Sequence, residues 1–415
     1  MNKNDSAIIR HLLGKKGMLE VDHVTQADIV IINTCSVRDH AEQRALGHIA
    51  TLRSWREQPG RILVVVGCMA QRCASFIMNE YPFVDLVLGP DSYRSITEKL
   101  KAVRDKQTRI RETELHDELY NGIYPQSSGV SDFISIMRGC NNYCSYCVVP
   151  YVRGPVRSRP VMDIIAQVST MVKNGVREIT LLGQNVNEYD HKGNDFAGLL
   201  EQVSRMPGLC RVRFLTSHPK DLTDKIINTI ARESVLCEWF HIPMQSGNDR
   251  ILALMNRQYT IGKYRDLVRT IRKKIPNATV TTDIIVGFPT ETDREYRDTI
   301  EVVKEIQFDD AYMYRYSSRP GTAAAGYDML PEKMIKNRLH DLIIIQNEIV
   351  TRKTKLMIGH TYEVLFEVPA RQGGMRGKTR GNKDVIVAMD VVPGTTANVK
   401  IEKVIGRTPT GAIVP

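Results

Sequence analysis

Runs of apolar residues alternate with amphipathic stretches along most of the chain. Near the N-terminus, residues 27–37, 61–72 and 85–90 are apolar on both faces and predict buried strands, and intervening stretches such as 40–55 predict helices. Strands without a polar face are typical of parallel sheets, and their alternation with helices is typical of an open α/β sheet. We therefore expect an N-terminal open α/β domain over residues 1–110.

A polar linker is expected over residues 111–131, because this segment shows little periodicity. Six apolar runs follow, and all but the last lead into a helical pattern. These six strands are expected at 133–139, 177–187, 211–219, 238–247, 279–289 and 311–318. Six repeats are too few for a closed eightfold barrel. The sequence therefore predicts a central partial (βα)6 TIM-like barrel over 132–352, with its strand ends at one mouth.

The last part of the chain changes character. Short β runs at 360–368, 384–391 and 396–406 are separated by Gly, Pro, Asn and Asp, a pattern that predicts a small antiparallel β-barrel over 353–415. A basic loop, 370–384, is expected between the first two runs. The chain as a whole is thus predicted to be an α/β protein that ends in a small β domain.

Composition narrows the class of protein. The chain has 415 residues, enough to bury a large core without disulfides, and a net charge of +10. Apolar runs fall short of the roughly 18 residues that a membrane span needs, and the N-terminus does not resemble a signal peptide. We expect a cytoplasmic protein with reduced cysteines. The positive charge favours an anionic partner, with nucleic acid as the leading candidate and a merely basic surface as the alternative.

Three cysteines, Cys140, Cys144 and Cys147, follow the first strand of the predicted barrel with the spacing C-x3-C-x2-C. A structural zinc site and a four-iron cluster both usually take four protein ligands. Three thiolates leave one iron of a 4Fe-4S cluster free to bind a small molecule, and radical chemistry on S-adenosylmethionine is one use of such a cluster. A zinc site with a distant fourth ligand and three incidental cysteines are the alternatives.

The cysteine loop, CNNYCSYC, resembles that of the radical S-adenosylmethionine superfamily. Blocks that run in order along nearly the whole chain are similar to those of its methylthiotransferases, and RGCNNYCSYCVVPYVRG and YSSRPGT are most similar to the subgroup that acts on tRNA. The other blocks are INTCSVRDHAEQ, VVGCMAQR, LLGQNVNEY, FHIPMQSGNDRILALMNRQYT, DIIVGFPTET and GKTRGNK. The resemblance implies that a methylthio group is added to C2 of N6-isopentenyladenosine beside the anticodon.

The resemblance also implies the cofactors. A 4Fe-4S cluster on Cys140, Cys144 and Cys147 would cleave S-adenosylmethionine to a 5′-deoxyadenosyl radical that removes hydrogen from C2 of the adenine. Sulfur is then inserted there, and a second S-adenosylmethionine supplies the methyl group. These three cysteines are therefore the expected catalytic and metal-binding residues. Tyr146, inside the loop, is expected to flank the adenine of S-adenosylmethionine, with plain loop packing as the alternative.

A second 4Fe-4S cluster is expected from the family on three further cysteines. Cys35 and Cys68 match two of them, and each follows a predicted strand. The third belongs to a block that would precede Met1, so we expect either a mis-assigned start or a fragment, and weak sulfur insertion by this chain. Cys73 is a possible substitute ligand, although a core thiol is the simpler interpretation.

Polar residues at the predicted strand ends are candidates for binding S-adenosylmethionine. They are Gln184, Asn185, Ser217, Gln245 and Asp283. Caps of the following helices are the alternative role for such residues. Three arginines follow the cysteine loop: Arg153, Arg157 and Arg159. They could pair with the carboxylate of the cofactor or with an RNA phosphate. The alternative is that they form a solvated basic face.

The C-terminal barrel resembles a TRAM domain, an RNA-binding module whose basic loop can contact phosphates. The expected RNA-binding residues are Arg319, Arg376, Lys378, Arg380 and Lys383, and Arg319 is expected to guide the target nucleotide. A plain charged hairpin is the alternative. The expected partners are tRNA, S-adenosylmethionine and an electron donor such as a flavodoxin-type protein, and the chain is expected to be a monomer.

Three rival functions stay open at this point. One relative modifies threonylcarbamoyladenosine in tRNA, and another methylthiolates an aspartate of a ribosomal protein, for which the basic loop is unfavourable. A non-catalytic iron–sulfur RNA-binding protein is the rival of another class. The intact C-x3-C-x2-C spacing is unfavourable to that third interpretation.

Overall fold

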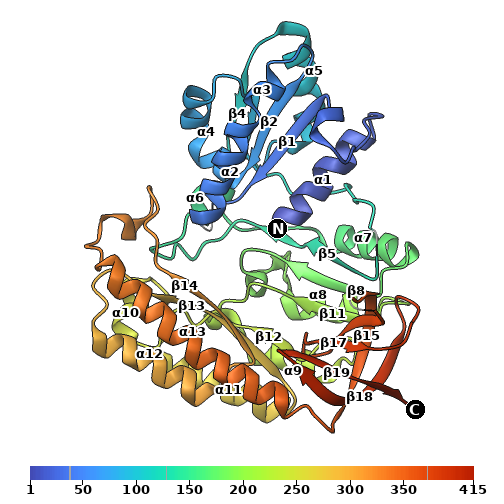
Figure 1. The fold of residues 1–415 in the computed structure, drawn as a ribbon, viewed down its shortest axis with the longest axis vertical. Helices are drawn as coiled ribbons and strands as arrows, with labels where there is room; N and C mark the ends of the chain where they lie inside the picture. The colour runs from blue at the N-terminus through green and yellow to red at the C-terminus, as the bar shows by residue number, and fades with distance from the viewer. Residues whose placement is uncertain (37–38, 128, 372) are drawn as a thin grey trace. The chain divides into compact units, whose positions relative to one another are not determined.

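A computed structural model describes residues 1–36, 39–127, 129–371 and 373–415 (Figure 1). The chain divides into two compact units. The first comprises Met1–Gln126, Ser135–Tyr143 and Cys147–Asp163, and the second comprises Ser127–Ile134, Cys144–Tyr146 and Ile164–Pro415. Among the described residues, every helix is too short or too polar to span a lipid bilayer.

The first unit is built on a four-stranded parallel sheet in the order β1-β2-β3-β4. Its strands are β1 (Ile29–Thr34), β2 (Ile62–Gly67), β3 (Leu86–Leu88) and β4 (Ile110–Glu112). Its helices are α1 (Asn2–Gly14), α2 (Asp39–Thr51), α3 (Arg53–Arg56), α4 (Cys68–Glu80), α5 (Ile96–Lys106) and α6 (Val149–Arg153). The three strands that the sequence predicts for this part are confirmed.

Both faces of this sheet are covered because its central strand has no polar face. Every residue of β2 is buried. Val64 and Val66 contact the core formed with α1 and α5, whereas Leu63 and Val65 contact the core formed with α2 and α4. Alternate side chains of one strand therefore hold a helical layer on each face, as in an open α/β sheet.

The segment predicted as a linker contributes to this unit. Its first residues lie in β4, and the buried Tyr120 and Ile123 join the core beside α5. The Tyr120 ring stacks on Tyr93 at a centroid distance of 5.7 Å. A three-residue strand with one exposed Arg leaves no periodic signal, so the sequence pattern missed it.

The second unit contains the six strands of the predicted barrel. They are β5 (Ser131–Ser135), β8 (Glu178–Leu182), β11 (Arg211–Phe214), β12 (Trp239–His241), β13 (Thr279–Val286) and β14 (Asp310–Arg315). They form two triplets, β5-β8-β11 and β12-β13-β14, and a parallel bridge between Val212 and Leu236 joins the triplets. The partial six-stranded barrel is confirmed.

Helices cover the outside of these strands (Figure 1). They are α7 (Val161–Lys173), α8 (Phe196–Ser204), α9 (Asp224–Arg232), α10 (Asp249–Leu254), α11 (Ile261–Lys274), α12 (Asp293–Ile306) and α13 (Glu332–Lys355). The predicted capping box is present at α12, where the Thr292 hydroxyl accepts from the Glu295 amide and the Glu295 carboxylate accepts from the Thr292 amide.

A closed five-stranded barrel ends the chain, in the order β15-β16-β17-β19-β18. Its strands are β15 (Thr361–Pro369), β16 (Met375–Thr379), β17 (Asp384–Val387), β18 (Thr396–Ile405) and β19 (Thr408–Val414). The small barrel is confirmed, but one of its pairings, β17 with β19, is parallel, because β19 closes the barrel at Ile386 and Thr410.

The expected basic loop, 370–384, is partly strand. β16 lies inside it, with Met375, Gly377 and Thr379 buried and Arg376 exposed between them. A Cβ atom at Gly377 would collide with the backbone of Leu365 on the neighbouring strand, so glycine is required there. Glycine and charged residues hid the two-residue period of this strand from the sequence pattern.

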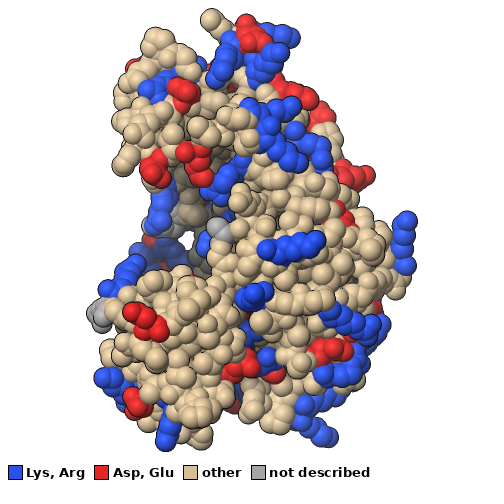
Figure 2. All heavy atoms as spheres, turned by 90° about the vertical axis from the view of Figure 1, so that its right-hand side faces the viewer, with Lys and Arg blue, Asp and Glu red and all other residues tan. Residues whose placement is uncertain are grey.

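Basic side chains are prominent on the surface. On the face drawn in Figure 2, Lys and Arg are spread over much of the surface, and Asp and Glu form smaller groups. This distribution agrees with the net charge of +10.

Candidate functional site

The cysteine loop begins at a sharp turn. Gly139 follows the short strand β6 (Met137–Arg138) and has a φ of +79°, and a Cβ atom there would collide with the carbonyl of Pro155. The Cys140 amide then donates to the carbonyl of Gly154 at 3.2 Å. A glycine is therefore needed for the loop to start against the segment that follows it.

The middle of the loop is anchored by Ser145. Its amide donates to the carbonyl of Met255 at 3.1 Å, and its hydroxyl donates to the carbonyl of Leu254 at 2.7 Å. Its own carbonyl accepts from the amide of Ala324 at 2.8 Å. Tyr146 packs against the apolar group that contains Met255 and Phe288. These contacts of Ser145 and Tyr146 fix the part of the loop that lies between Cys144 and Cys147.

Nitrogen donors point at two of the loop sulfurs. Asn142 Nδ2 lies 3.5 Å from Cys140 Sγ, and Arg257 Nη1 lies 3.3 Å from Cys144 Sγ. Burial works against the charge of Arg257, but Tyr259, Tyr146 and Cys144 outweigh it and raise the pKa of Arg257. A buried cation that donates to a sulfur favours the thiolate form, which is the form that binds metal.

The three cysteines of the loop supply the thiolates that usually hold iron–sulfur clusters. In a four-iron cluster each thiolate binds a different iron, so the three sulfurs need not converge on one point as they would round zinc. Cys140, Cys144 and Cys147 could therefore hold such a cluster with the two nitrogen donors beside it.

Buried polar atoms without partners mark the mouth of the barrel. Gln184 Oε1, Ser217 Oγ and Gln245 Oε1 are buried and have no hydrogen-bond partner in the described part of the chain. Gln245 also has a φ of +67°, an uncommon conformation for a residue other than glycine. Unsatisfied buried polar atoms are costly, so these three are suited to a polar ligand such as the amino acid or ribose part of S-adenosylmethionine.

Two other predicted mouth residues have protein partners. The Asn185 side chain donates to Asp221 at 2.7 Å and accepts from the amide of His218 at 3.1 Å. Asp283 lies 3.3 Å from Nε2 of His241. Asn185 therefore orients the loops round the mouth, whereas the half-buried Asp283 carboxylate keeps room for a further partner.

Cys35 and Cys68 lie where the sequence predicts them, just after β1 and β2. Those strands end side by side, with Thr34 opposite Gly67, and a Cβ atom at Gly67 would collide with the carbonyl of Thr34. The close approach of the two strand ends therefore depends on a glycine directly before Cys68. Cys73, in contrast, packs against the core beside α4 and lies 3.6 Å from Glu42, which favours the core-thiol interpretation.

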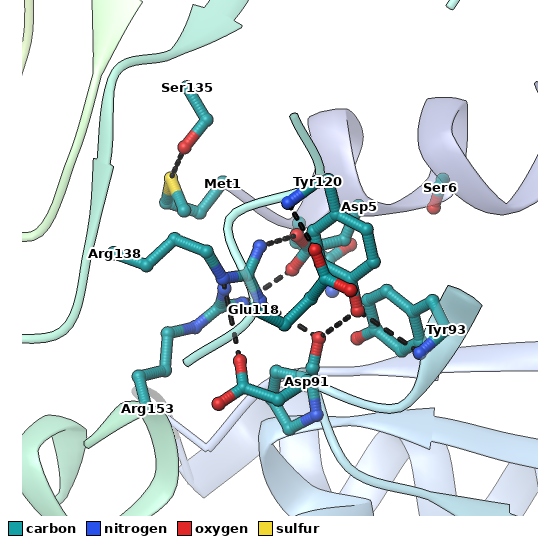
Figure 3. Close-up of polar contacts among 12 residues, drawn as sticks. Met1, Asp5, Ser6, Asp91, Tyr93, Glu118, Tyr120, Ser135, Arg138 and Arg153 are labelled. Carbon is teal, nitrogen blue, oxygen red and sulfur yellow. Dashed lines mark hydrogen bonds and ion pairs between the residues drawn. The ribbon is translucent and has the colours of Figure 1, made fainter. Parts of the chain in front are cut away.

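A buried network of charged residues adjoins Cys68. Arg153 Nε donates to Cys68 Sγ at 3.2 Å. The same guanidinium pairs with Asp5 (Figure 3). Arg138 pairs with Asp5 at 3.3 Å and with Asp91 at 3.5 Å. Both Arg138 and Arg153 are buried and point into this network, so the solvated face predicted for Arg153 is wrong, whereas its pairing with a cofactor carboxylate or RNA phosphate stays a prediction.

The other arginines of that run are also used internally. Arg157 pairs with Asp91 at 2.9 Å, and Arg159 pairs with Asp163 one helical turn along the chain. Sequence reasoning missed the pairing because Asp5 and Asp91 lie far away in the sequence. It also missed Arg257, although the block that contains it, LMNRQYT, was among those that carry the resemblance.

The five basic residues predicted for RNA binding differ in exposure. Arg376 is exposed and Lys378 is half-buried on β16. Arg380 forms a two-point pair with Glu238, with distances of 2.8 Å, and burial lowers the pKa of Lys383. Arg319 is buried. Arg376 and Lys378 are therefore the members of the set best placed on the surface.

One cavity of the second unit lies away from the strand ends that form the mouth. Its volume is about 930 Å³, and Trp239, Thr279, Asp310, His360 and Lys383 are among the residues that line it. Trp239, Thr279 and Asp310 are the first residues of β12, β13 and β14, so the cavity is at the opposite end of these strands from Gln245. Barrel enzymes carry their chemistry at the carboxyl ends of the strands, so we do not assign this cavity to the reaction.

Known proteins resemble the chain over nearly its whole length. Residues 1–89 match a family described as uncharacterized protein family UPF0004, and residues 134–303 match the radical SAM superfamily. The chain is 41% identical over 409 residues to the tRNA-2-methylthio-N(6)-dimethylallyladenosine synthase of Thermodesulfovibrio yellowstonii. These aligned residues cover 97% of this chain and 94% of the relative. The enzyme of the same name from Clostridium botulinum strain Hall is 42% identical over 417 residues, or 97% of this chain and 92% of the relative.

A solved structure shares the fold. The radical S-adenosylmethionine methyltransferase TsrM from Kitasatospora setae, with cobalamin and a 4Fe-4S cluster bound, superposes with a TM-score of 0.62 at 14% identity. The match covers 78% of this chain and 74% of TsrM. At this identity the similarity supports the radical SAM fold and carries nothing about the substrate.

Proposed function

Because the chain belongs to the family of tRNA-2-methylthio-N(6)-dimethylallyladenosine synthases, we propose that it adds a methylthio group to C2 of N6-isopentenyladenosine beside the anticodon of tRNA. It is a radical S-adenosylmethionine enzyme of the methylthiotransferase type. The observation that carries the substrate is the 41% identity over 97% of the chain. The two rival substrates, threonylcarbamoyladenosine in tRNA and an aspartate of a ribosomal protein, are less well supported. The relatives are named as synthases of the dimethylallyladenosine derivative.

Cys140, Cys144 and Cys147 bind the 4Fe-4S cluster in this proposal. When bound, the cluster supplies the electron that splits S-adenosylmethionine into methionine and the 5′-deoxyadenosyl radical that takes hydrogen from C2. Arg257 and Asn142 donate to the cysteine sulfurs and so stabilise negative charge there. The anchored Ser145 keeps the loop in position.

S-adenosylmethionine is held by the mouth residues. Gln184, Ser217 and Gln245 offer oxygen atoms that lack a partner among the described residues, and a ligand with ammonium and hydroxyl groups would satisfy them. Asp283 is half-buried and suits a hydroxyl or ammonium donor. Asn185 acts through the loops that it orients, and Tyr146 flanks the adenine.

A second 4Fe-4S cluster is proposed, with Cys35 and Cys68 among its ligands. The adjacent strand ends and the donor Arg153 support the proposal, because a cluster that carries negative charge gains from a buried cation. The flavodoxin-type electron donor, the monomeric state and the cytoplasmic location stay predictions from the sequence.

The substrate tRNA is bound in part by the C-terminal barrel. Arg376 and Lys378 on β16 are the proposed phosphate contacts, with Arg380 and Lys383 beside them. Arg380 has Glu238 as a partner, so its contribution to RNA binding is smaller than that of Arg376. Arg319, buried in the segment before Ala324, is proposed to guide the target nucleotide rather than to contact the RNA from the surface.

Nucleoside mass spectrometry of tRNA tests the proposal. Cells without the gene should lose 2-methylthio-N6-isopentenyladenosine and accumulate N6-isopentenyladenosine. Loss of the methylthio form of threonylcarbamoyladenosine instead would assign the chain to the rival tRNA substrate. Unchanged tRNA nucleosides, together with no 5′-deoxyadenosine from the reduced protein, would favour the non-catalytic RNA-binding alternative.

A further inference from the structure

Two tyrosine rings are exposed beside the cysteine loop. Tyr143 is 50% exposed and Tyr151 is 52% exposed, and their ring centroids lie 6.1 Å apart in an edge-to-face arrangement. Tyr143 lies between Cys140 and Cys144 in the chain, and Tyr151 belongs to α6. Tyrosine is enriched at binding interfaces because its ring is apolar and its hydroxyl group can form hydrogen bonds.

The backbone holds both rings outward. Tyr143 has a φ of +45°, a conformation that is costly for a bulky side chain. Val148, just before α6, and Val152 on α6 pack against Cys68, whereas Tyr151 on the same helix stays exposed. A strained loop residue and a short helix held through these two valines therefore place the rings together on the surface.

We propose that Tyr143 and Tyr151 form a stacking platform for a nucleotide of the anticodon loop that adjoins the modified adenosine. The proposal rests on the proposed function, because it takes the tRNA substrate as given. Single-stranded RNA is recognised largely by stacking of its bases on aromatic side chains. When the target base moves out of the stacked bases of the loop, the neighbouring base loses its stacking partner. An exposed tyrosine ring can take the place of that partner.

Position in the chain favours a base of the substrate over other occupants. Tyr143 is bonded to Cys144, a ligand of the proposed cluster, so a base on this ring lies beside the reacting centre. The tyrosines have no sulfur or charge with which to bind metal. Each ring has a π-face and a hydroxyl group, which suit a nucleobase and the ribose that carries it.

Binding to an anticodon stem-loop RNA that contains N6-isopentenyladenosine tests the platform. Fluorescence anisotropy would compare the reconstituted full chain with Tyr143→Ala and Tyr151→Ala. We expect each variant to bind about 5- to 150-fold more weakly, the range that corresponds to loss of one base stack, and each Tyr→Phe variant to stay close to the wild type. Phe76→Ala is the matched control, because Phe76 is 49% exposed and meets Tyr81 edge-to-face at 6.3 Å.

An abasic RNA keeps the test independent of folding. Stem-loops that lack the base on the 5′ or the 3′ side of the target should bind the wild type more weakly than the intact stem-loop does. With Tyr151→Ala, one of these two abasic stem-loops should bind as tightly as the intact stem-loop. Fully additive losses with both abasic RNAs would overturn the proposal. Unchanged RNA affinity in both Ala variants would also overturn the proposal. If, in addition, flavodoxin reduced these variants more slowly, the rings would be assigned to a protein partner.

The outcomes for the proposed function are separate. If the wild type forms the methylthio product while the tyrosine variants bind RNA normally, only the platform is wrong. If the wild type forms no methylthio product on any tRNA, the proposed function fails and the platform falls with it. Iron and sulfide content, measured for each variant, identifies any loss of the loop itself, and Tyr151 lies outside the cysteine spacing.

Discussion

Arg153 donates a hydrogen bond from Nε to the Sγ atom of Cys68 at 3.2 Å, while the other side of its guanidinium pairs with the buried Asp5. Three buried or nearly buried guanidinium groups face two carboxylates here. The members are Arg138, Arg153, Arg157, Asp5 and Asp91. One positive charge is in excess within this set. Burial raises the pKa of Cys68, and Arg153 opposes that shift.

Replacing Arg153 by Met should destabilise the first unit. The change leaves Asp5, which has no exposed surface, without its nearest cation. Removal of one partner from a buried ion pair costs about 3–5 kcal/mol in the free energy of unfolding. Urea unfolding followed by circular dichroism measures this loss in the metal-free chain.

Arg10→Met is the control for that substitution, because Arg10 pairs with Glu20 on the surface and loses at most about 1 kcal/mol. Asp5→Leu combined with Arg153→Met should recover part of the loss, since no unpaired carboxylate is then left. Equal effects of Arg153→Met and Arg10→Met would show that the buried pair does not stabilise the fold.

Protonation of His218 should make the second unit less stable in acid. Burial, together with the positive charges of Arg257 and Lys220, lowers the pKa of His218 to about 2. The pKa of a histidine in an unfolded chain is about 6.5. Above that pH neither state is protonated, and the stabilisation from the neutral ring is complete. As the pH falls below it, only the unfolded chain takes up the proton, so this stabilisation is lost progressively towards the low folded pKa.

The expected slope from His218 is about 1.4 kcal/mol for each pH unit below the unfolded pKa. Denaturant unfolding at pH 7 and pH 5 should therefore show a pH effect about 2 kcal/mol larger in the wild type than in His218→Gln. His340→Gln, at an exposed position on α13, should keep the wild-type pH effect. A His218→Gln variant with the full wild-type pH dependence would argue against a neutral, buried ring.

The sequence predicted the strands and the residues at their ends better than it predicted their partners. Buried strands give apolar runs, so β1, β2 and the six barrel strands were found, and with them Cys35, Cys68, Ser217 and Gln245. The short β4 and the glycine-rich β16 carry no such signal. A sequence shows that a residue is charged, but it does not show a partner that is distant along the chain.

Arg153 and Arg257 illustrate that limit. Asp5 is 148 residues from Arg153, and Cys144 is 113 residues from Arg257. No local period connects residues at such separations, so Arg153 was predicted to face a ligand or solvent, and the role of Arg257 was missed. Both contacts depend on how helices and loops pack, which is a property of the tertiary structure.

Loss of the Arg257 charge should lower the reduction potential of the cluster that we propose at Cys140, Cys144 and Cys147. The guanidinium donates to Cys144 Sγ at 3.3 Å, and a nearby cation stabilises the reduced cluster, which carries one more negative charge. A charge-assisted hydrogen bond corresponds to a shift on the order of 100 mV for a one-electron couple. A redox titration of Arg257→Met followed by electron paramagnetic resonance measures it.

Arg257→Lys keeps the charge and should show a smaller shift than Arg257→Met. Iron analysis of both variants accompanies the titration, because Arg257 also donates to the carbonyl of Pro243 at 3.2 Å and holds the loop that follows β12. A potential for Arg257→Met that equals or exceeds the wild-type value would contradict an electrostatic role for this arginine.

Ser217→Ala and Asn185→Ala should separate ligand binding from loop support. Ser217 Oγ is buried without a partner in the described part of the chain, so its removal costs the fold little but deprives S-adenosylmethionine of one hydrogen bond. We expect about tenfold weaker binding of S-adenosylmethionine by isothermal titration calorimetry, with the unfolding midpoint unchanged. Asn185 has three side-chain contacts, to Asp221, to Glu188 and to the amide of His218, so Asn185→Ala should lower the unfolding midpoint. If Ser217→Ala instead bound S-adenosylmethionine as tightly as the wild type, the ligand would have to satisfy other atoms of the mouth.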